Sequence, residues 1–234
     1  MDLRGVAMVT RAGTVRTELA GGLADAAAGI PCTPATRFQI CSISKQFAAV
    51  AALLLAEEGR LALDDPADRW LPDGPPRWSR VTLHHLLSHT AGVPHWLEAP
   101  GLDPAEPAPP GVRLAAIQAA PLRTAPGQAW HYTSPGFVLV GLIVERASGQ
   151  PYASFLTERI LAPLDLTTTG YGYGMFTGTF AGHAAYYHPG DNPGYRSFSV
   201  WLPDQAASLV VLANDDGVRI TDLLRQLLPA ALEP

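Results

Sequence analysis

Residues 41–59 have the sequence CSISKQFAAVAALLLAEEG, and this stretch carries the strongest structural signal in the chain. Beyond Ser42 its apolar residues return at spacings of three and four, which is typical of one face of an α-helix. These residues are Phe47, Val50, Ala51, Leu54 and Leu55. Gly59 follows as a residue type that commonly ends a helix. The pattern predicts a buried helix that begins near Ser42.

Strand signals stand on both sides of this helix, near the two ends of the chain. The predicted strands are residues 5–10, 14–19, 195–201 and 207–213. Ala12-Gly13 separates the first two strands and predicts a hairpin, and Pro203-Asp204-Gln205 predicts the turn between the last two. A shorter strand-like stretch covers residues 184–188, before the turn-forming sequence Asp191-Asn192-Pro193-Gly194.

Further helices are predicted at residues 82–88, 135–148 and 221–232, and a proline-rich loop from Pro94 to Pro110 should run over the surface. Strands at both ends with helices between them predict an α+β fold, in which both chain ends build one antiparallel sheet flanked by helices. The part of the chain inserted between these strands is expected to form a mostly helical subdomain of reduced size. We expect a single domain over 1–234, with the sheet part at about 1–60 and 171–234 and the helical part at about 61–170.

Composition excludes several classes of protein. The chain has 234 residues, of which 47% are hydrophobic and 16% charged, and its net charge is −5. These values predict a folded, soluble protein that does not bind nucleic acid. No apolar run is long enough for a membrane span, and the N-terminus has no signal-peptide pattern, which fits a cytoplasmic protein or the mature part of an exported one. Two cysteines predict neither a disulfide scaffold nor a metal knuckle. The compartment and the oligomeric state stay open.

Lys45 is the only lysine among the 16 basic residues, and it follows Ser42 by three positions. Arginine does not give up its proton in proteins, whereas lysine can serve as a general base. Both side chains should project from one face of the first helical turn and share a hydrogen bond. The positive end of the helix should lower the lysine pKa and favour a serine oxyanion. A capping serine followed by an ordinary lysine is the structural alternative.

Two further segments carry candidate functional residues. Tyr132-Thr133-Ser134 precedes the helix predicted at residues 135–148, and a phenol beside a cation can relay a proton. His188-Pro189-Gly190 ends the short strand-like stretch, where a small backbone step would let a substrate lie against the strand edge. There His188 is expected to donate to a substrate carboxylate or carbonyl. A half-buried tyrosine is the structural alternative for Tyr132.

In chain order, Ser42-x-x-Lys45, Tyr132-x-Ser134 and His188-Pro189-Gly190 resemble the motifs of the serine β-lactamase and penicillin-binding-protein superfamily. The resemblance is to its branch of class C β-lactamases, D-alanyl-D-alanine carboxypeptidases and family VIII-type esterases. It covers nearly the whole chain. The resemblance to family sequences extends to further segments, which are residues 38–40, 57–66, 86–92, 160–164 and 193–197.

This resemblance implies a serine hydrolase that acts through an acyl-enzyme on esters, D-amino-acid amides or peptides, or β-lactams, without a metal or cofactor. By the same resemblance Ser42 is the nucleophile, and Lys45 and Tyr132 share the acid–base work. Ser134, His188 and Gly190 would hold a small-molecule or peptide substrate. The oxyanion hole would use the backbone N–H groups of Ser42 and Asp191.

The sequence departs from the family pattern at two places. Ser134 stands where the branch usually has asparagine, so one donor and some reach are lost. The chain also passes through Thr169, Gly170 and Tyr171 without the long helical stretch that forms one wall of the cleft in relatives. Whether this short junction is natural or engineered stays open, and a more open, wetter site is expected.

Other functions are weaker alternatives. His84, His85, His89 and His95 cluster in the sequence, and His85 with His89 has the spacing of a helical metal-ligand pair, but no H-E-x-x-H motif completes it. We interpret His89 as structural. An α/β-hydrolase is excluded because no G-x-S-x-G motif occurs. A penicillin-recognising binder of the same fold that does not turn over its substrate stays open.

Overall fold

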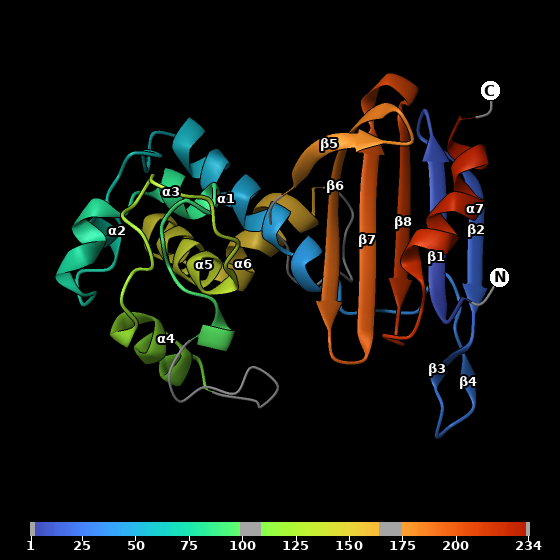
Figure 1. The fold of residues 1–234 in the computed structure, drawn as a ribbon, viewed down its shortest axis with the longest axis horizontal. Coiled ribbons are helices and arrows are strands. Elements are labelled where there is room, and N and C mark those ends of the chain that lie inside the picture. Colours follow the sequence, from blue (N-terminus) through green and yellow to red (C-terminus); the bar gives the residue numbers. More distant parts are fainter. Residues whose placement is uncertain (1–2, 99–108, 164–174, 233–234) are drawn as a thin grey trace. The chain divides into compact units, whose positions relative to one another are not determined.

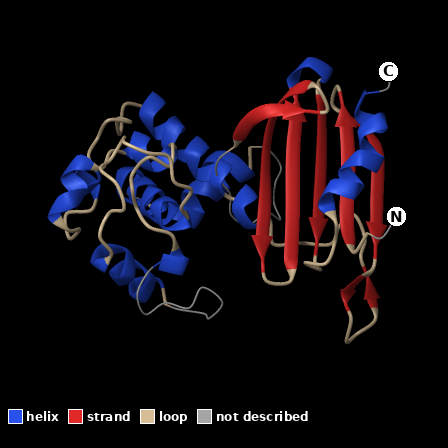
Figure 2. Cartoon of the chain, viewed as in Figure 1, coloured by secondary structure: helices blue, strands red, loops and turns tan. Residues whose placement is uncertain are grey.

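The computed structural model describes residues 3–98, 109–163 and 175–232, and the chain divides into two compact units. Residues 1–46 and 168–234 form the sheet unit, and residues 47–167 form the helical unit. The described strands gather in the sheet unit, whereas helices and loops make up the helical unit (Figure 2).

The sheet unit is built around six strands in the order β2-β1-β8-β7-β6-β5, in which every neighbouring pair is antiparallel (Figure 1). The strand bounds are β1 Gly5–Arg11, β2 Thr14–Gly21, β5 Phe176–Phe180, β6 His183–Asn192, β7 Tyr195–Leu202 and β8 Ala207–Ala213. Two short strands, β3 (Leu23–Asp25) and β4 (Ile30–Pro31), form a separate pair. Because β1 pairs directly with β8, the predicted α+β fold with a sheet from both chain ends is confirmed.

Local turn chemistry explains the first hairpin. Ala12 and Gly13 have φ angles of 48° and 76°, so both central residues lie in the left-handed region. A two-residue turn with this geometry matches the right-handed twist of the flanking strands. The predicted hairpin at Ala12-Gly13 therefore forms, with Arg11 opposite Thr14.

One face of the sheet carries the core of this unit. Along β8 the buried residues alternate with partly exposed ones, as expected when one face of a strand is covered. Helix α7 (Ile220–Leu232) lies along β1 and β8 and buries Leu223, Leu224 and Leu227 in the same core (Figure 1). This burial fixes the register, since a shift by one residue would turn the apolar side chains to the other face.

The helical unit surrounds α5. Its helices are α2 Ala67–Trp70, α3 Leu83–Leu87, α4 Pro110–Ala119, α5 Ser134–Ser148 and α6 Tyr152–Leu156, and most of α1, Lys45–Glu57, also belongs to it. Pro135 stands in the first turn of α5, and Gly149 ends the helix with a φ of 70° and an N–H donated to Glu145 O. No helix among the described ranges is long and apolar enough to cross a membrane.

Two predicted elements differ from the structure by three or more residues at one bound. The helix expected near Ser42 begins at Lys45, because Cys41 has a φ of 48° and residues Cys41–Ile43 form a 3-10 turn. The strand expected to end at His188 continues to Asn192. A proline within it is tolerated because β5 pairs with β6 only as far as Tyr187, so one side of β6 at Pro189 lies beyond β5.

Candidate active site

Ser42 lies in the middle of the 3-10 turn, directly before α1. Lys45 Nζ donates a hydrogen bond to Ser42 Oγ at 3.0 Å, so the contact predicted from their spacing is present. The turn is closed by the N–H groups of Ile43 and Ser44, which donate to Ile40 O and Cys41 O. The Ser44 hydroxyl also donates to Cys41 O. The hydroxyl of Ser42 is thus presented to a lysine from a tightly bonded turn.

Burial makes Lys45 suitable for proton transfer. The side chain belongs to a residue that is only 5% exposed, and this burial lowers the lysine pKa from 10.5 to about 8. The sequence predicted a lowered pKa from the helix terminus, whereas the structure assigns the main cause to desolvation. A pKa near 8 leaves a useful fraction of neutral amine at neutral pH, and that amine can accept a proton from Ser42.

His188 lies on β6 and is 3% exposed. Its Nδ1 is in hydrogen-bond contact with Pro189 O, and since a carbonyl oxygen can only accept, Nδ1 is the donor. The pKa of His188 is lowered from 6.5 to about 4, mainly by burial; the contact with Pro189 O opposes this shift and the nearby Lys45 charge adds to it. The imidazole is therefore neutral at neutral pH with its single proton on Nδ1, which leaves Nε2 as an acceptor rather than the donor to a substrate carboxylate or carbonyl that the sequence predicted.

Gly190 is the point where the turn with Ser42 packs against β6. A Cβ at this position would stand 2.3 Å from Ser197 Oγ and 2.9 Å from both Cys41 Cβ and Ile40 O. Glycine is therefore needed for close approach rather than for a positive φ. The next residue, Asp191, has an exposed side chain 3.3 Å from Arg196 Nε. The use of its backbone N–H for an oxyanion stays a prediction.

Tyr132 and Ser134 belong to the helical unit, where His89 supports the segment that carries them. The His89 ring lies 4.6 Å from the Tyr132 ring and 4.8 Å from the Phe137 ring, measured between centroids. The His89 carbonyl accepts from His131 N–H at 2.8 Å, and its Nδ1 accepts from Thr133 N–H at 3.3 Å. His89 thus holds the backbone on both sides of Tyr132, in agreement with the structural interpretation of His89.

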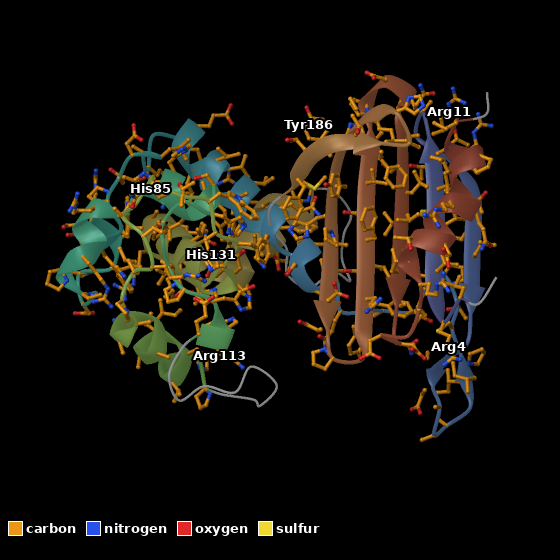
Figure 3. All side chains as sticks on the ribbon, in the orientation of Figure 1. Arg4, Arg11, His85, Arg113, His131 and Tyr186 are labelled. Atoms are coloured by element: carbon orange, nitrogen blue, oxygen red, sulfur yellow. The ribbon has the colours of Figure 1, made fainter. Side chains whose placement is uncertain are left out.

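Neighbouring contacts continue this support. Thr133 is buried and its hydroxyl donates to Pro94 O at 3.1 Å. His131 Nε2 accepts from Arg123 Nη1 at 3.0 Å, and Glu98 is an ion-pair partner of Arg123. Figure 3 labels His131 and His85 in this unit. Ser134 is the first residue of α5, and Pro135 follows it in the first turn of this helix.

The structure brings Ser42, Lys45, His188 and Gly190 together within the sheet unit. Contact between Ser42 and Tyr132 remains a prediction from the sequence. Sequence reasoning placed Ser197 in the family-like segment 193–197 but gave it no role. Its hydroxyl contacts the residue two positions before Ser42, and nothing in the local sequence signals a partner so far away. The short junction at 169–171 and much of the proline-rich loop lie outside the described residues.

The histidine cluster does not form a helical ligand pair. Helix α3 ends at Leu87 and His89 has a φ of 59°, so His85 and His89 do not share one helical face. His85 Nδ1 instead accepts the N–H of Thr82 at 3.1 Å and caps the helix. Within the described ranges, no three His, Cys, Asp or Glu side chains gather in a way that could hold a metal ion.

Comparison with known proteins gives a consistent result. The family model described as Beta-lactamase matches residues 1–171. Esterase EstB of Burkholderia gladioli is 37% identical over 183 residues, which is 71% of this chain and 46% of that protein. Penicillin-binding protein 4* of Bacillus subtilis (strain 168) is 29% identical over 223 residues, 93% of this chain and 48% of that protein. The chain thus spans about half the length of these relatives.

Solved structures share the fold. A penicillin binding protein from Bacillus halodurans superposes with a TM-score of 0.83 at 23% identity, covering 97% of this chain and 95% of that chain. The D-amino acid amidase from Ochrobactrum anthropi SV3 gives a TM-score of 0.80 at 18% identity, covering 96% and 94%. At these identities the likeness concerns the fold alone.

Proposed function

Because the chain belongs to the beta-lactamase family, we propose that it is a serine hydrolase that works through an acyl-enzyme. The observation that carries this proposal is the hydrogen bond of 3.0 Å between Lys45 Nζ and Ser42 Oγ, made by a buried lysine with a pKa of about 8. A capping serine beside an ordinary surface lysine would not need burial of the amine. The pair has the geometry and the protonation equilibrium of a nucleophile and its base.

The reaction begins with Lys45 as the neutral amine. Lys45 Nζ takes the proton of Ser42 as Oγ bonds to the substrate carbonyl carbon, and the carbonyl electron pair moves to its oxygen. The pair returns as the bond to the leaving group breaks, and the leaving group departs with that proton. Water then attacks the acyl-enzyme by the same route, which releases the acid and restores Ser42.

The remaining site residues have supporting roles in this proposal. Tyr132 shares the acid–base work by relaying the proton between Lys45 and the leaving group. The backbone N–H groups of Ser42 and Asp191 stabilise the oxyanion. Ser134, His188 and Gly190 orient the substrate. A metal or an organic cofactor has no part in these steps.

Esters are the first substrate class to test. The relative named an esterase is 37% identical to this chain, whereas the D-amino acid amidase shares the fold at 18% identity. D-amino-acid amides or peptides and β-lactams are the other classes. The second candidate function is a penicillin-recognising binder that acylates without turnover; the match to penicillin-binding protein 4* over 93% of this chain supports the recognition of penicillin.

The test combines covalent labelling with steady-state turnover. Wild type, Ser42→Ala and the control Ser79→Ala are incubated with a fluorophosphonate and a fluorescent penicillin, then assayed with a chromogenic ester and a chromogenic cephalosporin. Ser79 is exposed and its hydroxyl donates to Pro76 O, so its loss should not matter. Labelling and ester turnover that are lost only in Ser42→Ala support the hydrolase.

Three other outcomes have separate meanings. Stoichiometric labelling without turnover supports the binder. A wild type that neither labels nor turns over any probe contradicts the proposal. Activity that a chelator abolishes and zinc restores would mean that the reaction depends on a metal instead.

A further inference from the structure

We propose that Ser197 is a positioning residue for the nucleophile, acting through the backbone carbonyl of Ile40. This inference rests on the proposed function of Ser42 and adds a residue outside the motifs. Ser197 lies on β7 and is 2% exposed, and its Oγ donates to Ile40 O at 2.9 Å. The second oxygen near this hydroxyl, Gly190 O, is more distant at 3.4 Å. The single hydroxyl proton is therefore directed to Ile40.

Ile40 is two residues before Ser42, and its carbonyl oxygen accepts two hydrogen bonds. It accepts the N–H of Ile43 at 3.1 Å, which closes the 3-10 turn, and it accepts the Ser197 hydroxyl from the sheet. Two donors satisfy both lone pairs of the carbonyl oxygen. The turn that presents Ser42 is thus tied to a strand that lies 157 positions away in sequence.

The residue between Ile40 and Ser42 explains why such a tie is needed. Cys41 has a φ of 48°, in the left-handed region that a residue with a Cβ seldom adopts. A residue held in this conformation persists only when its surroundings over-determine it. The Ser197 hydroxyl fixes the carbonyl on the N-terminal side of Cys41, and the Ser44 hydroxyl bonds the carbonyl of Cys41 itself.

The sheet register makes this contact possible. Ser197 is the partner of Gly190 across β7 and β6. Because Gly190 has no Cβ, the chain at Ile40 and Cys41 can approach the strand pair closely enough for Ser197 to reach it. Gly190 makes the space and Ser197 supplies the bond, so together they set where Ser42 lies relative to β6.

Ser197 is buried behind the turn and acts on Ser42 only through Ile40. Its loss should therefore reduce the fraction of Ser42 hydroxyls aligned with Lys45 and leave substrate affinity unchanged. A neutral hydrogen bond to a backbone carbonyl has a modest net effect, and we expect acylation to slow about 10-fold.

The experiment measures the pre-steady-state burst with a p-nitrophenyl ester, which separates the acylation rate constant from the dissociation constant of the substrate. The variants are Ser197→Ala, Ser197→Thr and the control Ser199→Ala. Ser199 lies two positions along the same strand, and its buried Oγ has no hydrogen-bond partner in the described structure. We expect about a 10-fold slower burst in Ser197→Ala, a change below about 2-fold in Ser199→Ala, and substantial recovery in Ser197→Thr, which retains the hydroxyl.

Thermal unfolding of each variant accompanies the kinetics. If Ser197→Ala does not fold, Ser197→Cys keeps the volume with a weak donor, and a slow burst in it beside recovery in Ser197→Thr supports the inference. Equal acylation in Ser197→Ala and Ser199→Ala, or an effect confined to substrate affinity, would overturn it. A wild type without burst or labelling refutes the proposed function, and the positioning role with it.

Discussion

The turn at Ser42 and the segment at Tyr132 support candidate functional residues in a similar way but with different consequences. Each depends on a residue other than glycine with a positive φ, Cys41 at 48° and His89 at 59°. Each is held by a hydrogen bond to a carbonyl from a distant segment, from Ser197 to Ile40 O and from His131 to His89 O. Backbone strain at both places is therefore maintained by tertiary contacts.

The difference lies in what the strained residue touches. Cys41 is adjacent to Ser42, the proposed nucleophile, so a small shift of the turn moves Ser42 Oγ directly. His89 lies 43 positions before Tyr132 in sequence and acts on it through ring contact and through bonds on either side. Changes in the turn should appear first in the acylation rate, and changes at His89 should appear first in stability.

Lys45→Arg tests the chemistry of the turn and should have the largest effect. Arginine keeps the positive charge but cannot act as a base, so acylation should slow at least about 100-fold. Stopped-flow acylation with an ester substrate measures the change. Arg225→Lys, an exchange at an exposed position of α7, is the control and should behave as wild type. Near-normal turnover in Lys45→Arg would refute proton transfer by this residue.

Gly190→Ala tests the packing of the turn against β6. The new Cβ would overlap Ser197 Oγ, Ile40 O and Cys41 Cβ, so we expect a loss of about 3 kcal/mol in the free energy of unfolding together with slower acylation. Gly178→Ala on β5 is the matched control, because its Cβ would meet the Tyr187 ring at an ordinary 3.4 Å. Urea denaturation measures the free energy of unfolding of both variants. Equal stabilities of the two variants would show that the turn does not pack tightly here.

His89→Ala tests the other region. It removes the acceptor of the buried Thr133 N–H and the ring that contacts Tyr132, so unfolding should become easier by about 2 kcal/mol. Asparagine tolerates the positive φ, so His89→Asn should lose less free energy of unfolding than His89→Ala. The prediction fails if acylation falls sharply in a variant whose stability is unchanged, since that would give His89 a direct part in the reaction.

The pH dependence of the rate is the smallest effect. Lys45 must be neutral to act as the proposed base, and burial lowers its pKa to about 8, so kcat/KM should rise with a slope approaching about tenfold per pH unit well below that value and level off above it. Between pH 8 and pH 7 the neutral fraction of Lys45 falls from about one half to about one eleventh, which is a loss of about fivefold, equal to about 1 kcal/mol. A rate that is flat from pH 6 to pH 9 would contradict the role of Lys45. His188, neutral over this range, should not contribute a second step.

Much of the architecture was predictable because its causes are local. The hairpin at Ala12-Gly13 follows from two residues in the left-handed region, and α5 follows from its apolar spacing between Pro135 and Gly149. The contact between Ser42 and Lys45 follows from a spacing of three residues. Strand β5 was not predicted, since its five residues, FTGTF, carry only a weak alternating signal at the edge of the sheet.

The amino-acid sequence alone was sufficient for the α+β class, the family resemblance and the pairing of the sole lysine with Ser42, because periodicity, turn chemistry and short spacings act over a few residues. Tertiary packing alone decided the pKa of Lys45, the neutrality of His188 and the bond from Ser197 to Ile40. Desolvation depends on every segment that packs around a group, and strand register brings together residues 157 positions apart. Neither the desolvation of a group nor the register of its strand can be read from the sequence close to that group.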